Sequence, residues 1–258
     1  MSDDRATRAE QRGSALWITL NRPQARNALS AELVASLLAD LRAAQSDPRA
    51  RVIVLTGAGS AFCAGADLKN RGDMGGAGRN PFVEILRLVR HGEKPVIAAV
   101  NGHAFGGGLG LVAAADIAIG ADSALMSFSE VRIGAVPAMI SVVVLPKVGP
   151  HQTMRLFLTG ERFDARKAQG YGLLHQVVPA AELERAVDAE VHAIAQGGPN
   201  AVREAKQLIR TVERLPEDEA FAFAEKKIAE LFASDEAREG MRAFAEKRPP
   251  SWVPKQDG

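Results

Sequence analysis

The chain has 258 residues, enough for one large domain with a helical extension and too few for an assembly of many domains. Hydrophobic residues make up 47% of it and charged residues 24%, which is typical of a globular protein with a sizeable core and excludes disorder as its main state. Its 32 Lys and Arg against 31 Asp and Glu give a net charge of +1 without a dense basic run, so nucleic acid is not predicted as a partner.

The number of cysteines and the absence of long apolar segments indicate the cellular location. The single cysteine, Cys63, excludes an intramolecular disulfide and any multi-cysteine metal site, and the histidines show no metal-ligand spacing, so no metal is predicted. The first ten residues lack the apolar segment of a secretory signal. The longest apolar stretch, residues 135–145, is interrupted by Pro137 and Ser141 and is too short to span a membrane. We therefore expect a cytoplasmic protein without membrane contact.

In the first quarter of the chain, strand and helix patterns alternate. Residues 15–20 are rich in β-branched and aromatic side chains and predict a strand. Ser30 is a suitable cap for a helix that should end at Asp47, before Pro48, and its apolar positions form one stripe, namely Leu33, Val34, Leu37, Leu38 and Leu41. Residues 51–56 predict a buried strand.

The middle of the chain repeats this order. A strand is predicted at residues 95–100, a helix up to Ala115 and a short strand at 117–119. Strands that alternate with helices indicate an α/β core. Residues 70–80 are rich in glycine, so we interpret them as a flexible flap beside a site formed by the preceding segment.

The last part of the chain is helical in pattern. Amphipathic periodicity predicts helices at 180–196, 199–213, 216–233 and 235–247, with few strand candidates. This change divides the chain into residues 1–180, which hold the core, and residues 181–258, which form a helical region outside the sheet layer.

Two glycine-rich segments follow predicted strands and open helices. They are FCAGADLK at 62–69 and VNGHAFGGGLG at 100–110. A helix start exposes amides that have no partner within the helix, and two such amides from separate loops could form an oxyanion hole. The alternative is that these glycines only form turns and packing positions. Neither segment has the spacing of a dinucleotide-binding or phosphate-binding loop.

Four ordered motifs carry a family resemblance. The two glycine-rich segments, followed by FSEVRIGAVP at 128–137 and AREGMRAFAEKRPPSW at 237–252, resemble the enoyl-CoA hydratase/isomerase (crotonase) superfamily, and the similarity begins at LNRPQARNALS, residues 20–30. The resemblance implies an α/β fold, with a crotonase-like β-β-α spiral core and a C-terminal helical trimerisation region. It also implies a homotrimer or a dimer of trimers.

The resemblance also implies roles for individual residues. Ala66 and Gly107 match the positions whose amides polarise the thioester carbonyl of an acyl-CoA, and Glu130 matches the principal catalytic glutamate. The stretch around the first loop corresponds to positions that contact coenzyme A, and two C-terminal positions correspond to residues that reach coenzyme A on a neighbouring subunit. These substrate-binding candidates are Ala64, Ala66, Asp67, Leu68, Lys69, Gly107, Phe244 and Lys247. For the two lysines, the alternative is a solvated surface charge.

One position departs from the family pattern. The best-known hydratases carry a second glutamate where this chain has Gly110, one helical turn after Gly107. Three consequences remain open: Glu130 alone activates water, a single carboxylate moves one proton between carbons as in an isomerase, or the enlarged space admits a branched acyl group. Some bacterial hydratases of branched glutaconyl-type acyl-CoAs are similar in this region. Ala138, where many relatives have glycine, is a milder departure.

The resulting expectation is an enoyl-CoA hydratase that adds water across the 2,3 double bond of an acyl-CoA thioester. Coenzyme A is part of the substrate, and no further cofactor is predicted. We expect residues 70–80 and 135–145 to line the acyl pocket. The alternatives are an enoyl-CoA double-bond isomerase and a non-catalytic acyl-CoA-binding member. Among the other conspicuous residues, Cys63 and Trp17 are predicted to pack in the core, Trp252 to dock the tail, and His103 and Asp116 to stabilise local structure.

Overall fold

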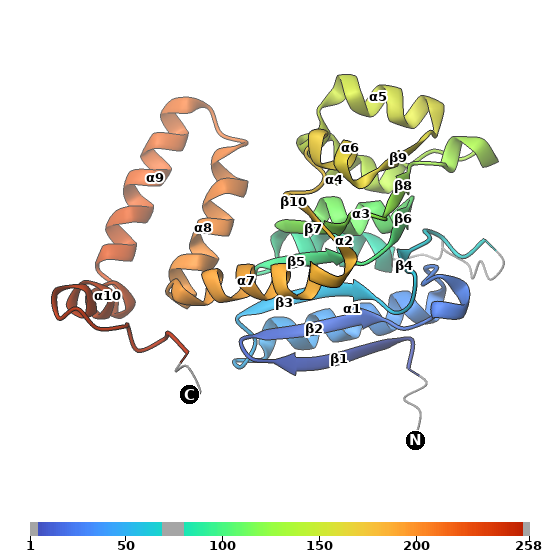
Figure 1. Cartoon of the computed structure of the whole chain (residues 1–258). Helices are drawn as coiled ribbons and strands as arrows, with labels where there is room; N and C mark the ends of the chain where they lie inside the picture. The colour runs from blue at the N-terminus through green and yellow to red at the C-terminus, as the bar shows by residue number, and fades with distance from the viewer. Residues whose placement is uncertain (1–4, 69–79, 255–258) are drawn as a thin grey trace.

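The computed structural model describes residues 5–68 and 80–254. Two sheets form its centre (Figure 1). The strands of the large sheet, in spatial order, are β1 (Thr7–Arg12), β2 (Ala15–Leu20), β3 (Val52–Gly57), β5 (Val96–Val100), β7 (Ile117–Ala121) and β10 (Gln176–Val178). Those of the small sheet are β4 (Ala61–Cys63), β6 (His103–Phe105), β8 (Leu125–Ser127) and β9 (Arg162–Asp164).

Successive turns of chain stack in register. Each of three turns places one strand in the large sheet and the next strand in the small sheet, and then forms a helix. The three helices are α2 (Pro81–His91), α3 (Gly107–Ala114) and α4 (Ala138–Val148). All pairs in the large sheet are parallel except β1 with β2. This arrangement confirms the predicted β-β-α spiral.

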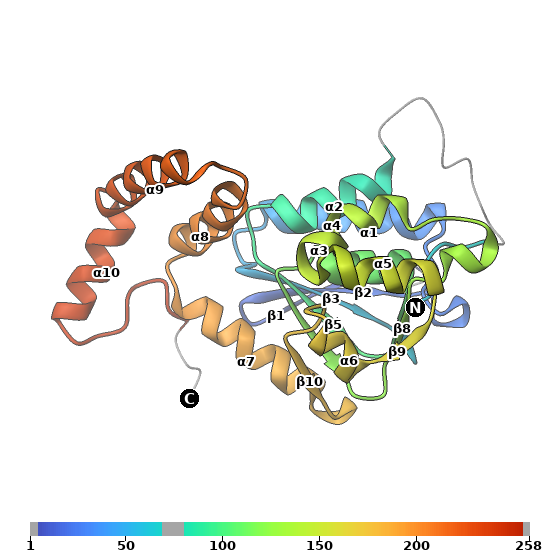
Figure 2. The ribbon, with the colours of Figure 1, turned by 90° about the horizontal axis from the view of Figure 1, so that it is seen from above.

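Helix α1 (Ala31–Ser46) shows how the sequence produces these layers. Ser30 caps it by accepting a hydrogen bond from the Leu33 amide, at 3.2 Å, and the predicted apolar stripe is buried against the large sheet. Such a cap stabilises a helix by about 1 kcal/mol. Helices α1, α2 and α3 lie on the same side of the large sheet (Figure 2), where α2 contacts both α1 and α3. The strand and helix predictions for residues 15–56 are confirmed.

The opposite face of the large sheet is covered by α7 (Leu183–Gln196). Its buried residues Leu183, Val187 and Val191 pack with Trp17 and Ile97 in a second apolar cluster. The sequence pattern predicted a helix here but not its packing partner: the apolar stripe of α7 fits a sheet face that no other helix of the described chain covers. The boundary at residue 180 itself stays a prediction.

The remaining helices complete the chain. Between β8 and β10 lie η2 (Glu130–Ile133), α4, α5 (Pro150–Thr159) and α6 (Ala165–Gly170), and after α7 come α8 (Pro199–Val212), α9 (Glu217–Phe232) and α10 (Asp235–Ala245). The last three project from the core as an arm (Figures 1 and 2). Trp252 docks that arm by donating from Nε1 to the carbonyl of Gln196, at 3.0 Å. In the described residues, no helix is both long and apolar enough to cross a membrane.

Candidate active site

Strand pairing brings the two glycine-rich loops together. Strands β4 and β6 are parallel neighbours, so the loops that follow them leave the same end of the small sheet. Gly65 lies against the second loop, since a Cβ on it would be 2.9 Å from the Phe105 carbonyl oxygen and 3.6 Å from the Gly107 nitrogen. Its φ of +87° also favours glycine. Close approach of the two loops therefore depends on glycine at position 65.

A short parallel bridge orients the first loop. Leu29 pairs with Ala66: the Leu29 amide donates to the Gly65 carbonyl at 2.8 Å, and the Asp67 amide donates to the Leu29 carbonyl at 3.3 Å. In a parallel bridge these bonds use the groups flanking Ala66, so the Ala66 amide itself points to the other side of the loop. Within the described part of the chain, that amide has no hydrogen-bond acceptor.

The second loop supplies an amide by a different route. Gly107 is the first residue of α3, and the amides of a first helical turn have no acceptor in their own helix. Both Ala66 and Gly107 line one cavity of about 230 Å³, as do Ala64, Gly65 and Leu68. The structure thus places both predicted oxyanion donors around a common space.

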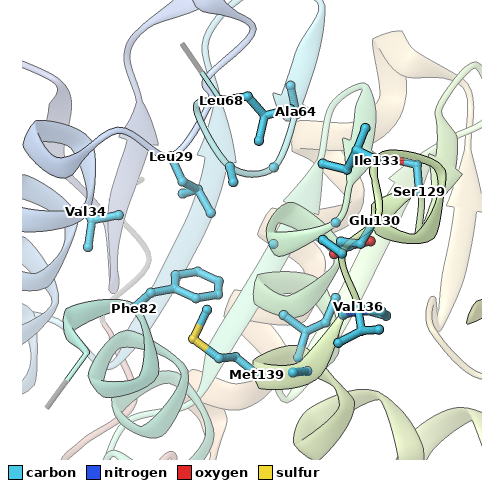
Figure 3. A pocket seen from close by; sticks show the side chains of 18 residues that line it. Leu29, Val34, Ala64, Leu68, Phe82, Ser129, Glu130, Ile133, Val136 and Met139 are labelled. Atoms are coloured by element: carbon cyan, nitrogen blue, oxygen red, sulfur yellow. The ribbon is translucent and has the colours of Figure 1, made fainter. Parts of the chain in front are cut away.

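Glu130 stands in the same cavity. Figure 3 shows its carboxylate between Ile133 and Val136, across the cavity from Leu29 and Phe82. Its Oε2 atom is buried and has no hydrogen-bond partner among the described residues. Desolvation by this burial raises the pKa of Glu130 above its ordinary value, while a backbone hydrogen bond opposes the shift. A carboxylate with a raised pKa is a stronger base than an ordinary glutamate, which suits it to accepting and returning a proton.

The rest of the cavity wall is apolar. Of the described residues that line it, only Ser129 and Glu130 have polar side chains. The others, besides those of the glycine-rich loops, are Leu29, Val34, Phe82, Ile133, Ala135, Val136, Pro137, Ala138, Met139 and Ile140. Of the two segments expected to line the acyl pocket, residues 135–140 line this cavity, whereas 141–145 and Asn80 do not. Residues 70–79 and Lys69 lie outside the described residues. Three further lining residues, Leu29, Val34 and Phe82, were not predicted from the sequence. The sequence offered only their positions on helix faces or beside a motif, which do not indicate a cavity.

Asp67 has a different environment from its neighbours. Its side chain is 8% exposed, does not line the cavity, and accepts a hydrogen bond from Arg22 Nη1 at 3.2 Å in an ion pair. This pair ties the loop to the segment before α1. The structure therefore gives Asp67 a role in holding the loop. Its predicted contact with coenzyme A stays a prediction.

Gly110 does not enlarge the cavity, contrary to one expectation. A Cβ at this position would lie 2.3 Å from Ile140 Cγ2, so the Ile140 side chain already fills the space. Gly110 itself is buried and does not line the cavity. The expectation of enlarged space is wrong because α4 packs its side chain into the gap.

The two C-terminal candidates lie away from this cavity. Phe244 is 87% exposed on α10, and Lys247 is exposed just after it. In Figures 1 and 2, α10 is at the far end of the arm from the two loops. Neither residue lines the cavity of its own chain, so their predicted contact with coenzyme A on a neighbouring subunit stays a prediction.

Other conspicuous residues have structural roles. His103 accepts a hydrogen bond from the Leu125 amide through Nδ1, and Asp116 accepts one from the Val96 amide and pairs with Lys206 at 2.8 Å. Burial raises the pKa of the Cys63 thiol to about 12, which makes it a poor nucleophile. No three His, Cys, Asp or Glu side chains of residues 5–68 and 80–254 are placed to hold a metal ion.

Comparison with known proteins agrees with this geometry. The enoyl-CoA hydratase/isomerase family profile matches residues 10–255. The chain belongs to this family. It is 38% identical to enoyl-CoA hydratase EchA19 of Mycobacterium tuberculosis, over 94% of each chain, and 37% identical to carnitinyl-CoA dehydratase of Escherichia coli, over 93% of this chain and 95% of that one.

Solved structures extend the similarity to the fold. An enoyl-CoA hydratase from Shewanella pealeana superposes with a TM-score of 0.90 at 28% identity, covering 96% of both chains. Pseudomonas aeruginosa AtuE gives a TM-score of 0.90 at 34% identity, covering 96% of this chain and all of the other. The names of the two sequence relatives specify different reactions, a hydration and a dehydration. Family membership therefore establishes a crotonase-type enzyme, and the individual reaction has to be argued from the site.

Proposed function

We propose that this protein is an enoyl-CoA hydratase, which adds water reversibly across the 2,3 double bond of an acyl-CoA thioester. The observation that carries the proposal is the Glu130 carboxylate, whose buried Oε2 atom has no hydrogen-bond partner among the described residues. It lies in an apolar cavity that Ala66 and Gly107 also line. Acyl-CoA thioester substrates are common to the enzymes of this family, and the hydratase name of several relatives supports the direction of the chemistry.

The proposed reaction uses one carboxylate for both proton transfers. Glu130 accepts a proton from water while the water oxygen bonds to C3, and the electrons of the double bond move toward the thioester carbonyl. The negative charge then rests on the carbonyl oxygen, where the Ala66 and Gly107 amides stabilise it. Glu130 returns the proton to C2, which completes the addition and restores the carboxylate.

The remaining parts of the proposal concern binding and assembly. The reaction as written needs no separate cofactor, because coenzyme A arrives with the substrate. Ala64 and Leu68 line the cavity. We propose that Lys69, the next residue of the chain, contacts the nucleotide part of coenzyme A. We also propose a homotrimer or a dimer of trimers, in which Phe244 and Lys247 approach a neighbouring site. A cytoplasmic location, without nucleic-acid or membrane partners, stays a prediction.

A double-bond isomerase is the second candidate, and one observation favours it. Glu130 is the only carboxylate among the described residues that line the cavity. A single carboxylate is sufficient to move a proton from C2 to C4 of a 3-enoyl thioester, which needs no attacking water. Both reactions would use the same oxyanion donors. Hydration also consumes a water molecule, whereas isomerisation needs no second reactant.

Absorbance of the conjugated enoyl thioester distinguishes the candidates. We expect purified protein to bleach it with 2-enoyl-CoA substrates and Glu130→Gln to lose 10²-fold or more of that rate, since general acid–base catalysis contributes about this much. Glu161→Gln, in an exposed ion pair with Arg155, is the matched control and should keep the rate. Growth of absorbance from 3-enoyl-CoA without bleaching would assign the isomerase, and acyl-CoA binding without either change would assign a non-catalytic member.

A further inference from the structure

Ile140 on α4 leaves no room for a side chain at Gly110 on α3. A Cβ built on Gly110 would be 2.3 Å from Ile140 Cγ2 and 3.0 Å from Ile140 Cβ, with Leu86 Cδ2 of α2 at 3.7 Å. Real side chains essentially never approach this closely. Ile140 thus occupies the volume that any side chain at position 110 would need.

Ile140 also belongs to the cavity wall. It is 3% exposed and lines the cavity together with Gly107, whereas Gly110 is shielded from the cavity. Gly110 follows Gly107 by three residues, or about 4.5 Å along the helix axis. The Ile140 side chain therefore fills the space beside the position one helical turn after Gly107, whose amide is proposed to hold the carbonyl oxygen.

We infer that Ile140 is a specificity-determining residue, which limits the size of the groups that a substrate carries next to the reacting C2 and C3 carbons. The same side chain requires glycine at position 110, so the two positions can change only together. The limit on acyl size rests on the proposed function, whereas the packing dependence does not.

A double-mutant cycle tests the packing dependence through thermal unfolding. We expect Gly110→Ala to lower the unfolding midpoint in the native background, with an approximately tenfold or greater loss in the folded-to-unfolded ratio, because overpacking of a full core is destabilising. In an Ile140→Gly background, the same change should have little effect or stabilise. Gly170→Ala is the control, since a Cβ there meets nothing within 4 Å. Equal losses in both backgrounds would refute the dependence.

Binding of saturated acyl-CoAs tests the limit on acyl size without requiring turnover. The probes are butanoyl-CoA and its analogues with one and two methyl groups on C3, titrated by calorimetry. We expect Ile140→Ala to improve affinity for branched over unbranched chains by about tenfold or more, which is the usual effect of one or two methylenes in a pocket. Val142→Ala, on the same helix but 68% exposed and outside the cavity wall, should leave the ratio unchanged.

Two outcomes separate the failure of this inference from the failure of the proposed reaction. An unchanged branched-to-unbranched ratio in Ile140→Ala, with intact binding of both probes, would overturn the role of Ile140. Absence of hydration by the native protein would overturn the proposed reaction alone, because the affinity ratio and the unfolding cycle do not depend on chemistry.

Discussion

Gly106 and Glu130 are in direct contact: a Cβ on Gly106 would lie 2.9 Å from the Oε1 atom of Glu130. Gly106 adopts φ +49° and ψ −117°, a conformation that side chains disfavour, and immediately precedes Gly107. Gly106 therefore has two roles: the absence of a side chain leaves room for the Glu130 carboxylate, and its backbone conformation lets the chain enter α3. This contact joins the proton-transfer group to the oxyanion loop.

Gly106→Ala is expected to reduce kcat of the proposed reaction by about 10²-fold, because a displaced carboxylate or amide misaligns the reacting groups. Steady-state kinetics would measure the loss. Gly149→Ala is the control for backbone strain alone, since Gly149 has φ +76° and open space around its Cβ position. Equal activity of the Gly106 and Gly149 variants would contradict the role of the contact.

The pH dependence of kcat/KM should report the state of Glu130. Its burial raises the pKa, and hydration requires the ionised form, so activity should fall as pH decreases through a value above that of an ordinary glutamate. Ionisation of Glu130 should also lower the free energy of unfolding as pH rises, because its pKa is higher in the folded than in the unfolded protein. A carboxylate in an ion pair has the opposite effect. An acidic limb at or below the ordinary glutamate pKa would contradict this assignment.

The buried ion pair of Arg22 with Asp67 should be needed for loop placement. We expect Asp67→Asn to destabilise the protein by about 1–3 kcal/mol, since it leaves the 16% exposed Arg22 side chain with a weaker partner, and to lower kcat/KM. Chemical denaturation and steady-state assays measure the two effects. Glu84→Gln, which breaks an exposed pair with Arg42, should change stability by less than about 0.5 kcal/mol.

The buried amino group of Lys147 should make the stability of the protein depend on pH, independently of catalysis. Burial lowers the pKa of its amino group from 10.5 to about 8, although Nζ still donates to the Ala115 carbonyl at 2.6 Å. Between these two values the unfolded chain binds more protons, so this group makes the protein more stable as pH rises from 8 toward 10.5. Denaturation of Lys147→Met should lack this rise, while Lys226→Met, at an exposed position, should keep it.

Self-association should depend on the arm. Large apolar side chains are exposed on α8, α9 and α10, namely Ile209, Phe221, Ile228, Phe232, Met241 and Phe244. We expect the native protein to sediment at three or six times the mass of one chain and Phe232→Glu to shift it to the mass of a single chain. Lys226→Glu, on the same helix and already charged, should leave the mass unchanged. Native protein that sediments as a monomer would refute the proposed assembly.

Regular periodicity explains which parts of the fold were predictable. The stripe of α1 and the apolar strand β3 each match one packing environment, so their pattern alone predicted them. Strand β1 was missed because it is a polar edge strand in which only Thr7 is fully buried. The packing of α7 was also missed, since periodicity identifies an apolar face and not the surface that covers it.

The same distinction applies to the site. Glu130 and Gly107 could be recognised because each lies within a local motif. The filling of the Gly110 position by Ile140 involves residues 30 positions apart, and it follows from the approach of α3 to α4. A missing side chain in a sequence therefore did not indicate an empty volume in the structure.

The only cysteine offers a direct view of motion beneath the proposed site. The Cys63 thiol is fully buried, and the Cys63 backbone carbonyl and Cβ lie against Gly108 in the first turn of α3. A thiol-specific reagent can reach this sulfur only when the packing around β4 opens. The rate of labelling under native conditions consequently measures how often the packing around β4, beneath the proposed site, opens. A bound acyl-CoA analogue should slow that rate in proportion to its occupancy.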